Sequence, residues 1–364
     1  MRFPEFSGEW KKVRLGDNCN IQMCKRIMAA QTNTDRGVPF YKIGTIGGKA
    51  DAYISKELFD EYKAKYPFPH KGEVMITCAG TVGKCIIYNG KDSYYQDSNI
   101  VWIDNPNEII SNDFLYHLLC KVNWSHLNST TIVRIYNDDL RNLKLYIPQH
   151  DEQKKITHLL SLINERIATQ NKIIEDLKLL KSAIRKKVFV SLKEEHTESL
   201  EINQLLTYEQ PTAYIVTNDE YSTDTTLIPV LTANKGFVLG YTDEDFSIYQ
   251  KGECIIFDDF TMDAKYVSFP FKVKSSAIKI LTAKPNVNLR FMFEYLSYLE
   301  LKSEEHKRHY ISEIASLVVE LPSKEMQNKI ASLMASLDNK LALEENTKVK
   351  YEDEKQYQLS QMFI

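Results

Sequence analysis

The segment Gly80-Thr81-Val82-Gly83-Lys84 is the first candidate for chemistry, because glycines followed by a lysine can cradle a phosphate group. A complete phosphate-binding loop has the pattern G-x-x-x-x-G-K-[ST]. In this sequence Cys78 stands in place of the first glycine, and Cys85 in place of the final Ser or Thr. The glycines therefore predict a tight hairpin between two strands, with Lys84 near its tip.

Other catalytic patterns are also incomplete. Glu61-Tyr62-Lys63 has half of a nuclease carboxylate-lysine pair but no upstream Pro-Asp, and its polar surroundings predict a surface helix. Asn105-Pro106-Asn107 lacks the second proline and the aromatic residue of an amino-methyltransferase motif. No G-x-G-x-x-G follows a predicted strand, and the eight histidines form no recognisable triad. We therefore expect a chain that binds and does not catalyse.

The cysteines give no sign of a zinc site. No C-x-x-C pair is present, and no histidine pair lies nearby at zinc-finger spacing. We expect reduced and mostly buried thiols, which are Cys19, Cys24, Cys78, Cys85, Cys120 and Cys254.

The composition, 43% hydrophobic and 26% charged, is that of a globular protein. With neither a membrane-length apolar run nor a signal-peptide pattern at Met1, a cytoplasmic chain without membrane contact is expected. The net charge is −3 but is unevenly distributed. Residues 1–150 hold 19 basic against 16 acidic side chains, whereas residues 196–322 hold 11 against 19. Any surface that binds nucleic acid must therefore be local.

The most informative feature is a long internal repeat with a shift of 174 residues. Residue types agree without a gap from Arg134 to Phe189 when placed over the segment that starts at Arg308. The matches include Ile147-Pro148 over Leu321-Pro322, Gln153 over Gln327, and Lys155-Ile156 over Lys329-Ile330. Upstream the agreement is weaker, although Phe114-Leu115-Tyr116 resembles Phe291-Met292-Phe293. A repeat this long indicates duplication of a whole domain together with a helix.

Each copy ends in a long predicted helix, at about 151–191 and 324–363. In the first, apolar residues from Ile156 to Val188 alternate at three-four spacing for about five heptads, interrupted by Gln170 and Lys181. The second becomes polar at the core positions Glu344, Lys348 and Lys355. Each helix would be about 60 Å long. So narrow an apolar seam favours pairing of the two copies, while packing of each helix on its own domain is the alternative.

The remaining sequence predicts α+β domains with short strands bounded by Gly, Asn or Asp. A short aromatic helix near 112–121 or 289–301 closes each domain. The predicted strands are 74–77, 85–88 and 100–103 in the first copy, and 254–257, 266–268 and 277–281 in the second. The division is thus a domain at 1–150, a helix at 151–195, a second domain at 196–322 and a second helix at 323–364.

This order of parts resembles the specificity subunit of type I restriction-modification systems, over essentially the whole chain. The opening Trp10 to Asp17 is similar to the start of a target-recognition domain, and Ile135-Tyr136 through Pro148 to Ile156 is similar to its end. Pro39 to Gly44, and Lys71 to Ile76 followed by the glycine hairpin, resemble the domain interior. Phe257 to Thr261 and Lys265 to Phe271 resemble another common variant of this domain.

The resemblance implies that each recognition domain reads one half of a split site in double-stranded DNA, while the helices form an antiparallel coiled coil that sets their spacing. Two methyltransferase subunits would dock on this chain and restriction subunits would join them. S-adenosylmethionine, ATP and Mg²⁺ would bind to those partners, with no cofactor and no metal in this chain. Because the two domains differ in sequence, the half-sites should differ and the site should not be a palindrome.

Candidate DNA contacts are the basic and polar residues of the predicted loops, since Arg and Lys bind phosphates or guanine edges and shorter polar side chains reach other base edges. Arg134 and Arg308 occupy equivalent positions in the repeat, so they are equally interpreted as anchors between a domain and its helix. In the first domain the candidates are Lys25, Arg26, Arg36, Lys42, Thr45, Thr81, Lys84 and Arg134, and in the second Asn234, Lys235, Thr261, Lys265, Lys274, Ser275 and Arg308.

Two alternatives remain open: a recognition module separated from a fused methylase-nuclease, and a scaffold that does not bind DNA. A neighbouring methyltransferase gene would argue against the scaffold. The acidic second domain is unusual for a DNA-binding module, and its carboxylates are expected on a face turned away from DNA.

Overall fold

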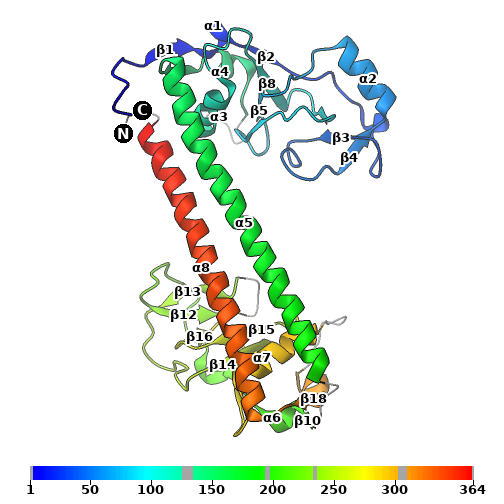
Figure 1. The fold of residues 1–364 in the computed structure, drawn as a ribbon, viewed down its shortest axis with the longest axis vertical. Helices are drawn as coiled ribbons and strands as arrows, with labels where there is room; N and C mark the ends of the chain where they lie inside the picture. The colour runs from blue at the N-terminus through cyan, green and yellow to red at the C-terminus, as the bar shows by residue number, and fades with distance from the viewer. Residues whose placement is uncertain (1–2, 125–133, 193–196, 233–235, 302–309, 363–364) are drawn as a thin grey trace. The chain divides into compact units, whose positions relative to one another are not determined.

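The computed structural model describes residues 3–124, 134–192, 197–232, 236–301 and 310–362. They form two compact units: unit 1 comprises Met1–Ala168 with Val349–Ile364, and unit 2 comprises Thr169–Lys348. The two long helices, α5 (His150–Leu192) and α8 (Lys324–Met362), each contribute residues to both units (Figure 1). The predicted mixed α+β class with long helices is confirmed.

The described residues of unit 1 form three small sheets. The largest has the strand order β2-β8-β5-β6 with antiparallel neighbours, a second has the order β4-β3-β7, and β1 pairs with β9. The elements before α5 are β1 (Lys11–Arg14), α1 (Leu15–Asn18), β2 (Asn20–Gln22), η1 (Ala29–Gln31), β3 (Val38–Tyr41), β4 (Ala52–Ile54), α2 (Lys56–Lys65), β5 (Val74–Thr77), β6 (Cys85–Ile87), β7 (Tyr94–Tyr95), β8 (Ile100–Asp104), α3 (Asn112–Lys121), α4 (Asn137–Arg141) and β9 (Lys144–Ile147).

The four-stranded sheet of unit 1 is covered on both faces, because alternate residues of a strand point in opposite directions. Val74 and Ile76 of β5 pack in a core with α3 and the first turns of α5. Met75, between them, packs on the other face among the aromatic residues of β3, β7 and α2. Since both faces are buried, Val74, Met75 and Ile76 of β5 form an unbroken apolar run, and the sequence prediction of a strand at 74–77 is confirmed.

Unit 2 repeats this topology strand for strand, with sheet orders β11-β17-β14-β15 and β13-β12-β16 and the pair β10-β18. Its elements between the long helices are β10 (Glu198–Glu201), α6 (Ile202–Leu205), β11 (Leu206–Glu209), η3 (Pro211–Tyr214), β12 (Ile228–Leu231), β13 (Val238–Thr242), β14 (Cys254–Asp258), β15 (Ala264–Val267), β16 (Lys272–Val273), β17 (Ile278–Ala283), α7 (Leu289–Tyr298), η4 (Tyr310–Ile314) and β18 (Val318–Leu321). The duplication therefore extends through the whole domain, further than the sequence agreement.

The repeat has the same joint between domain and helix in both units. In unit 1 the buried Gln153 of α5 accepts a hydrogen bond from the backbone N of Ser111, which caps α3, at 2.8 Å. In unit 2 Gln327 of α8 accepts the equivalent bond from Asn288, which caps α7, also at 2.8 Å. Each glutamine amide then donates to the carbonyl of the preceding Pro148 or Pro322. The pair Gln153 and Gln327, matched in the repeat, thus fixes each closing helix to a long helix.

The long helices run antiparallel, as predicted. In unit 1 the Arg166 guanidinium of α5 lies 5.9 Å from the ring centroid of Tyr351 in α8. In unit 2, further along α5, Lys181 pairs with Asp338, which is earlier in α8. Apolar side chains of both helices share one core in each unit: Leu160 and Met362 belong to the same core in unit 1, and Phe189 and Met334 to the same core in unit 2.

None of the helices in the described ranges is both long and apolar enough to cross a membrane.

Candidate nucleic-acid interface

Loops from distant parts of the sequence meet at one end of the four-stranded sheet of unit 1. The strand register sets this geometry: Thr77, the last residue of β5, pairs with Ile100, the first of β8, and β6 begins beside them at Cys85. β2 also ends here, since Gln22 pairs with Trp102. We call this surface loop edge 1 and define it as residues 23–26, 42–48, 78–84, 96–99 and 134–135.

The predicted glycine hairpin is present, and it joins β5 to β6. Gly80 and Gly83 have φ values of 66° and 83°, in the left-handed region that favours glycine. A β-carbon on Gly83 would lie 2.2 Å from Cδ1 of Trp124, so no other residue fits there without movement. Lys84 lies at the base of the hairpin, opposite Thr77, and the prediction that it is near the tip is wrong.

Hydrogen bonds and ion pairs hold the basic side chains of loop edge 1 in place. Arg26 pairs with Asp97 at 2.8 Å, and Arg134 donates to the carbonyl of Ser98 at 3.2 Å. Lys84 donates from Nζ to the carbonyl of Ile46 at 2.5 Å, which joins the hairpin to residues 42–48. An ammonium has three donors, so this contact leaves capacity for an anion such as a phosphate. Loop edge 1 therefore carries several basic side chains whose positions are fixed by neighbouring groups.

Other predicted contacts of the first domain differ in their surroundings. Lys42 pairs with Asp51 at 3.2 Å, and Lys25 lies over the ring of Tyr66. The Thr45 hydroxyl accepts a bond from the Lys42 amide and so closes a turn. Thr81 is exposed in the hairpin. Arg36 precedes β3, at the opposite end of that strand from Lys42, so it is not brought together with the others.

Unit 2 has an equivalent surface, loop edge 2, defined as residues 259–263 and 274–277. It contains the β14–β15 hairpin with the exposed Thr261, and the segment before β17 with Lys274 and Ser275. Lys265 is exposed on β15, the edge strand next to this hairpin. The predicted contacts Asn234, Lys235 and Arg308 lie outside the described residues.

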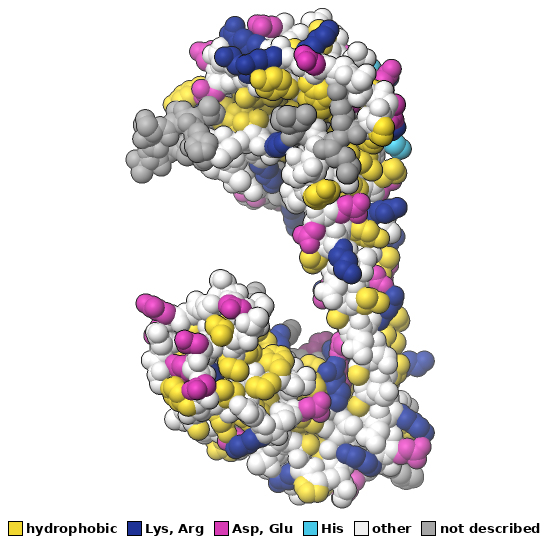
Figure 2. Space-filling view, turned by 90° about the vertical axis from the view of Figure 1, so that its left-hand side faces the viewer, with side chains coloured by type: hydrophobic (Ala, Val, Ile, Leu, Met, Phe, Trp, Pro, Cys, Tyr) yellow, Lys and Arg dark blue, Asp and Glu magenta, His cyan; other side chains and the backbone are white. Residues whose placement is uncertain are grey.

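Several acidic residues of unit 2 are internal partners. Asp259 is 1% exposed and pairs with the equally buried Lys279 at 3.3 Å, while Glu244 pairs with the fully buried Lys272 at 2.5 Å. Figure 2 shows that other acidic side chains remain on the surface of unit 2. The exposed ones include Asp219, Glu220, Asp224, Asp243 and Asp245, in and around the β12–β13 hairpin. The acidity of this domain is therefore partly structural.

A cluster of charges that sequence reasoning missed lies between α5, α7 and α8 in unit 2. The Glu294 carboxylate is fully buried and lies 3.2 Å from Nζ of Lys181 and 2.7 Å from Nη2 of Arg185. Arg290 lies 3.4 Å from it, and both Arg290 and Lys181 also pair with Asp338. In the sequence Lys181 only interrupts the apolar seam, and spacing along one helix does not reveal its partner.

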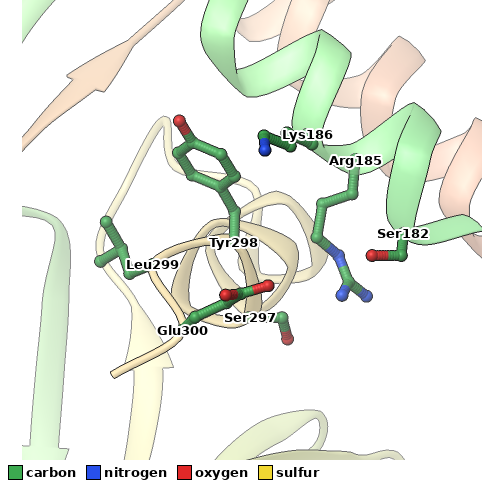
Figure 3. A pocket seen from close by; sticks show the side chains of 7 residues that line it. All are labelled: Ser182, Arg185, Lys186, Ser297, Tyr298, Leu299 and Glu300. Carbon is green, nitrogen blue, oxygen red and sulfur yellow. The ribbon is translucent and has the colours of Figure 1, made fainter. Parts of the chain in front are cut away.

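A pocket of about 320 Å³ adjoins this cluster. Figure 3 shows the side chains of Arg185 and Lys186 on α5 facing the end of α7, where Tyr298 and Glu300 lie. The remaining lining residues are Ser182, Ser297 and Leu299. These side chains contain neither a thiol nor an imidazole. The basic residues of this pocket belong to the run Lys181 to Lys187, the one sequence signal that pointed to it.

Among the described residues, no group of three or more His, Cys, Asp or Glu is arranged to hold a metal ion. The six cysteines are free thiols, five of them buried, which agrees with the sequence expectation, and Cys120 is exposed.

These features define a class of protein: a duplicated α+β recognition fold whose two copies share a pair of antiparallel helices. The chain belongs to the family described as type I restriction modification DNA specificity domain, whose model matches residues 7–179 and 194–352.

Two relatives agree with this assignment. A Haemophilus influenzae protein that has the name of a type I restriction enzyme specificity subunit is 46% identical over 169 residues, or 46% of this chain and 43% of that protein. The EcoR124I/EcoR124II specificity subunit of Escherichia coli is 40% identical over 146 residues, or 38% and 36% of the two chains. The matched segments thus span less than half the length of either relative.

Solved structures share the fold over the whole chain. The type I restriction-modification S subunit from M. genitalium matches with a TM-score of 0.65 at 15% identity, covering 100% of this chain and 99% of that one. A chain from work on complex assembly and conformational transition of the type I R-M system matches with a TM-score of 0.58 at 14% identity, covering 98% of each. At such low identity the likeness concerns the fold alone.

Proposed function

We propose that this chain is the specificity subunit of a type I restriction-modification enzyme, in which loop edge 1 and loop edge 2 each read one half of a split, asymmetric site in double-stranded DNA. The observation that carries the proposal is the duplication itself. One strand topology occurs twice, and loop edge 1 and loop edge 2 follow corresponding strands of the two four-stranded sheets but have different side chains. Two domains of the same fold with different loop side chains are suited to bind two different DNA half-sites.

The same proposal includes protein partners. Two methyltransferase subunits would bind this chain, and restriction subunits would join through the complex. Exposed apolar side chains on both long helices support a protein interface, since such residues are uncommon in groups on solvent-facing helices. On α5 they are Leu162, Ile173, Leu179, Leu180 and Val190, and on α8 Leu333, Leu343, Val349 and Tyr357.

The chemistry would belong to these partners. We propose that this chain has no catalytic activity, and that S-adenosylmethionine, ATP and Mg²⁺ act on the methyltransferase and restriction subunits. Because its target would be DNA, we also propose that the chain works in the cytoplasm.

The first test is methylome sequencing of cells that express this chain with its neighbouring methyltransferase. We expect a split, non-palindromic methylated motif that disappears when this chain is deleted. Unchanged methylation in its absence would contradict the proposal and favour the scaffold that does not bind DNA.

The second test concerns Lys84. Replacing it with Ala should weaken DNA binding by the assembled methyltransferase and, if Lys84 contacts a phosphate, lower the salt dependence by about one unit of log–log slope. The matched control is Lys91→Ala, because Lys91 is exposed beyond the other end of β6. If Lys84→Ala binds with unchanged affinity and salt slope, Lys84 is not a DNA contact. Lys265→Ala tests unit 2 in the same way.

A further inference from the structure

Asp259 lies where the two segments of loop edge 2 meet. It is the first residue after β14, and its backbone N donates to the carbonyl of Ala277 at 3.1 Å. The residue is 1% exposed, and its carboxylate oxygen Oδ1 accepts a hydrogen bond from the backbone N of Tyr310 at 2.8 Å. One buried residue therefore joins the β14–β15 hairpin, the segment before β17 and the start of η4.

The second oxygen of this carboxylate is held by Lys279 on β17. Nζ of Lys279 lies 3.3 Å from Oδ2 of Asp259, and the lysine is also 1% exposed. The same Nζ lies 5.7 Å from the ring centroid of Tyr208, whose ring packs against that of Tyr310 with centroids 5.7 Å apart. The carboxylate thus contacts the Tyr310 segment directly, and the lysine contacts it through Tyr208.

Unit 1 shows that the fold itself does not require this ion pair. A shift of 180 residues aligns the strand before each hairpin, and it places Ala79 at the position of Asp259. The strand register likewise places Ile100 of β8 where unit 2 has Lys279 of β17. The same sheet therefore forms with an apolar pair in place of the two charges.

We propose that Asp259 is a positioning residue for DNA recognition by unit 2, and that Lys279 holds its carboxylate in the orientation that fixes loop edge 2. A buried ion pair contributes little net stability, because the desolvation of both charges offsets their attraction. Its directed contacts instead restrict where the joined segments lie. Asp259 is buried and acts through the exposed residues of those segments, which are Thr261, Lys274 and Ser275. This role rests on the proposed function, because it concerns the half-site that loop edge 2 reads.

The test gives unit 2 the apolar pair of unit 1, by combining Asp259→Ala with Lys279→Ile in what we call the apolar-pair variant. The full chain is assembled with its methyltransferase subunits. Binding is then measured to its methylated motif and to sites with one base pair changed in either half. We expect the preference for the correct base pair to fall by about tenfold in the half-site of unit 2 and to stay unchanged in the other half.

Glu294→Gln is the matched control, because it also removes a buried charge of unit 2 while the partners of that carboxylate lie on α5 and α7. It should lower the denaturant midpoint and leave both half-site preferences unchanged. The apolar-pair variant should do the reverse. The proposal is overturned by unchanged preferences in the apolar-pair variant, or by an equal loss in both halves. It is also overturned if this variant is destabilised as much as Glu294→Gln, since the ion pair would then be a structural requirement.

A third variant separates the hydrogen bond from the charges. Asp259→Asn with Lys279→Met removes both charges but keeps an oxygen that can accept from the Tyr310 amide. It should retain more of the preference in the half-site of unit 2 than the apolar-pair variant does. The same loss in both would overturn the role of this hydrogen bond.

Residue-resolved hydrogen exchange of the full chain tests the positioning without DNA. In the apolar-pair variant the Tyr310 amide has lost its acceptor, so it should exchange faster, together with the amides of 259–263. The amides of β14 and β17 should keep their protection. Unchanged exchange at Tyr310 would overturn the positioning role. If exchange changes as expected but the unmodified complex shows no preference for any DNA sequence, the failure is that of the proposed function.

Discussion

The short helices α3 and α7 occupy the same place in the two repeats, and a lysine of a long helix approaches each of them. The two helices differ in the side chain that this lysine meets. Lys181 and Lys355 are equivalent under the 174-residue repeat, and each approaches the closing helix of its own unit. In unit 2 the residue that Lys181 meets is Glu294, with Arg185 and Arg290 around it. In unit 1 the equivalent residue is His117, which is buried.

The difference lies in the residue that the lysine approaches, which is a carboxylate in unit 2 and an imidazole in unit 1. In unit 2 the carboxylate neutralises the lysine, and further cations complete the network. In unit 1 burial, with a smaller contribution from Lys355, lowers the pKa of His117 to about 4, so the imidazole is neutral near pH 7. The contribution of the unit 2 network to stability therefore depends on its buried carboxylate, whereas the contribution of His117 to stability depends on pH.

The largest predicted effect is at Glu294. Glu294→Gln leaves Lys181, Arg185 and Arg290 without their buried carboxylate, and breaking such a pair costs about 3–5 kcal/mol. The expected result is a clearly lower denaturant midpoint for the unfolding of the full chain. The matched control is His117→Gln at the equivalent position, which should cost much less near pH 7. Equal losses in the two variants would show that the charge cluster does not stabilise unit 2.

The next effect is the pH dependence at His117. The unfolded chain binds this proton below pH 6.5, but the folded chain binds it only below about pH 4, so the unfolded state holds more protons in between. Stability should therefore fall as pH decreases from 6.5 to 4, by on the order of 3 kcal/mol. Comparing His117→Gln with the unmodified chain across this range isolates the contribution. Identical pH profiles would mean that His117 is not held neutral by burial.

The smallest effect is expected at Gln170, in the part of the long helices that belongs to unit 2. Gln170 and Glu344 are equivalent under the repeat, and the Gln170 amide donates to the carbonyl of Glu344 at 3.0 Å and to its carboxylate. Gln170→Leu should lower the melting temperature by no more than a few degrees, because Glu344 keeps its pair with Lys340. Glu344→Gln, which preserves an acceptor, should be milder still. A large loss for Gln170→Leu would show that this contact sets the helix register, as buried polar residues do in coiled coils.

Sequence reasoning predicted the regular elements well, for a physical reason. The apolar period along 151–191 and the runs of β-branched and aromatic residues such as 100–103 indicate which faces are buried, because side-chain direction follows from local helix or strand geometry. The glycines at 80 and 83 likewise predicted a hairpin, because few other residues adopt their conformation. Because the sequence is duplicated, the helices and strands predicted for one domain were also expected in the other.

Partners across the fold were not predictable in this way. Gln170 and Lys181 looked like defects in an apolar seam, and only the antiparallel pairing of α5 with α8 shows that Glu344 and Asp338 meet them. The position of Lys84 at the base of its hairpin also required the register of β5 with β6.

The sequence by itself determined the duplication, the helices, the strand segments and the family of this chain, since these follow from local periodicity and from comparison of one half with the other. The tertiary structure decided which charges are neutralised, as at Glu294, and which side chains meet across the long helices, as at Gln170 and Glu344. Such pairings join residues far apart in the chain, and their energy depends on burial and distance. Burial and distance between such residues are set only when the helices and strands pack together.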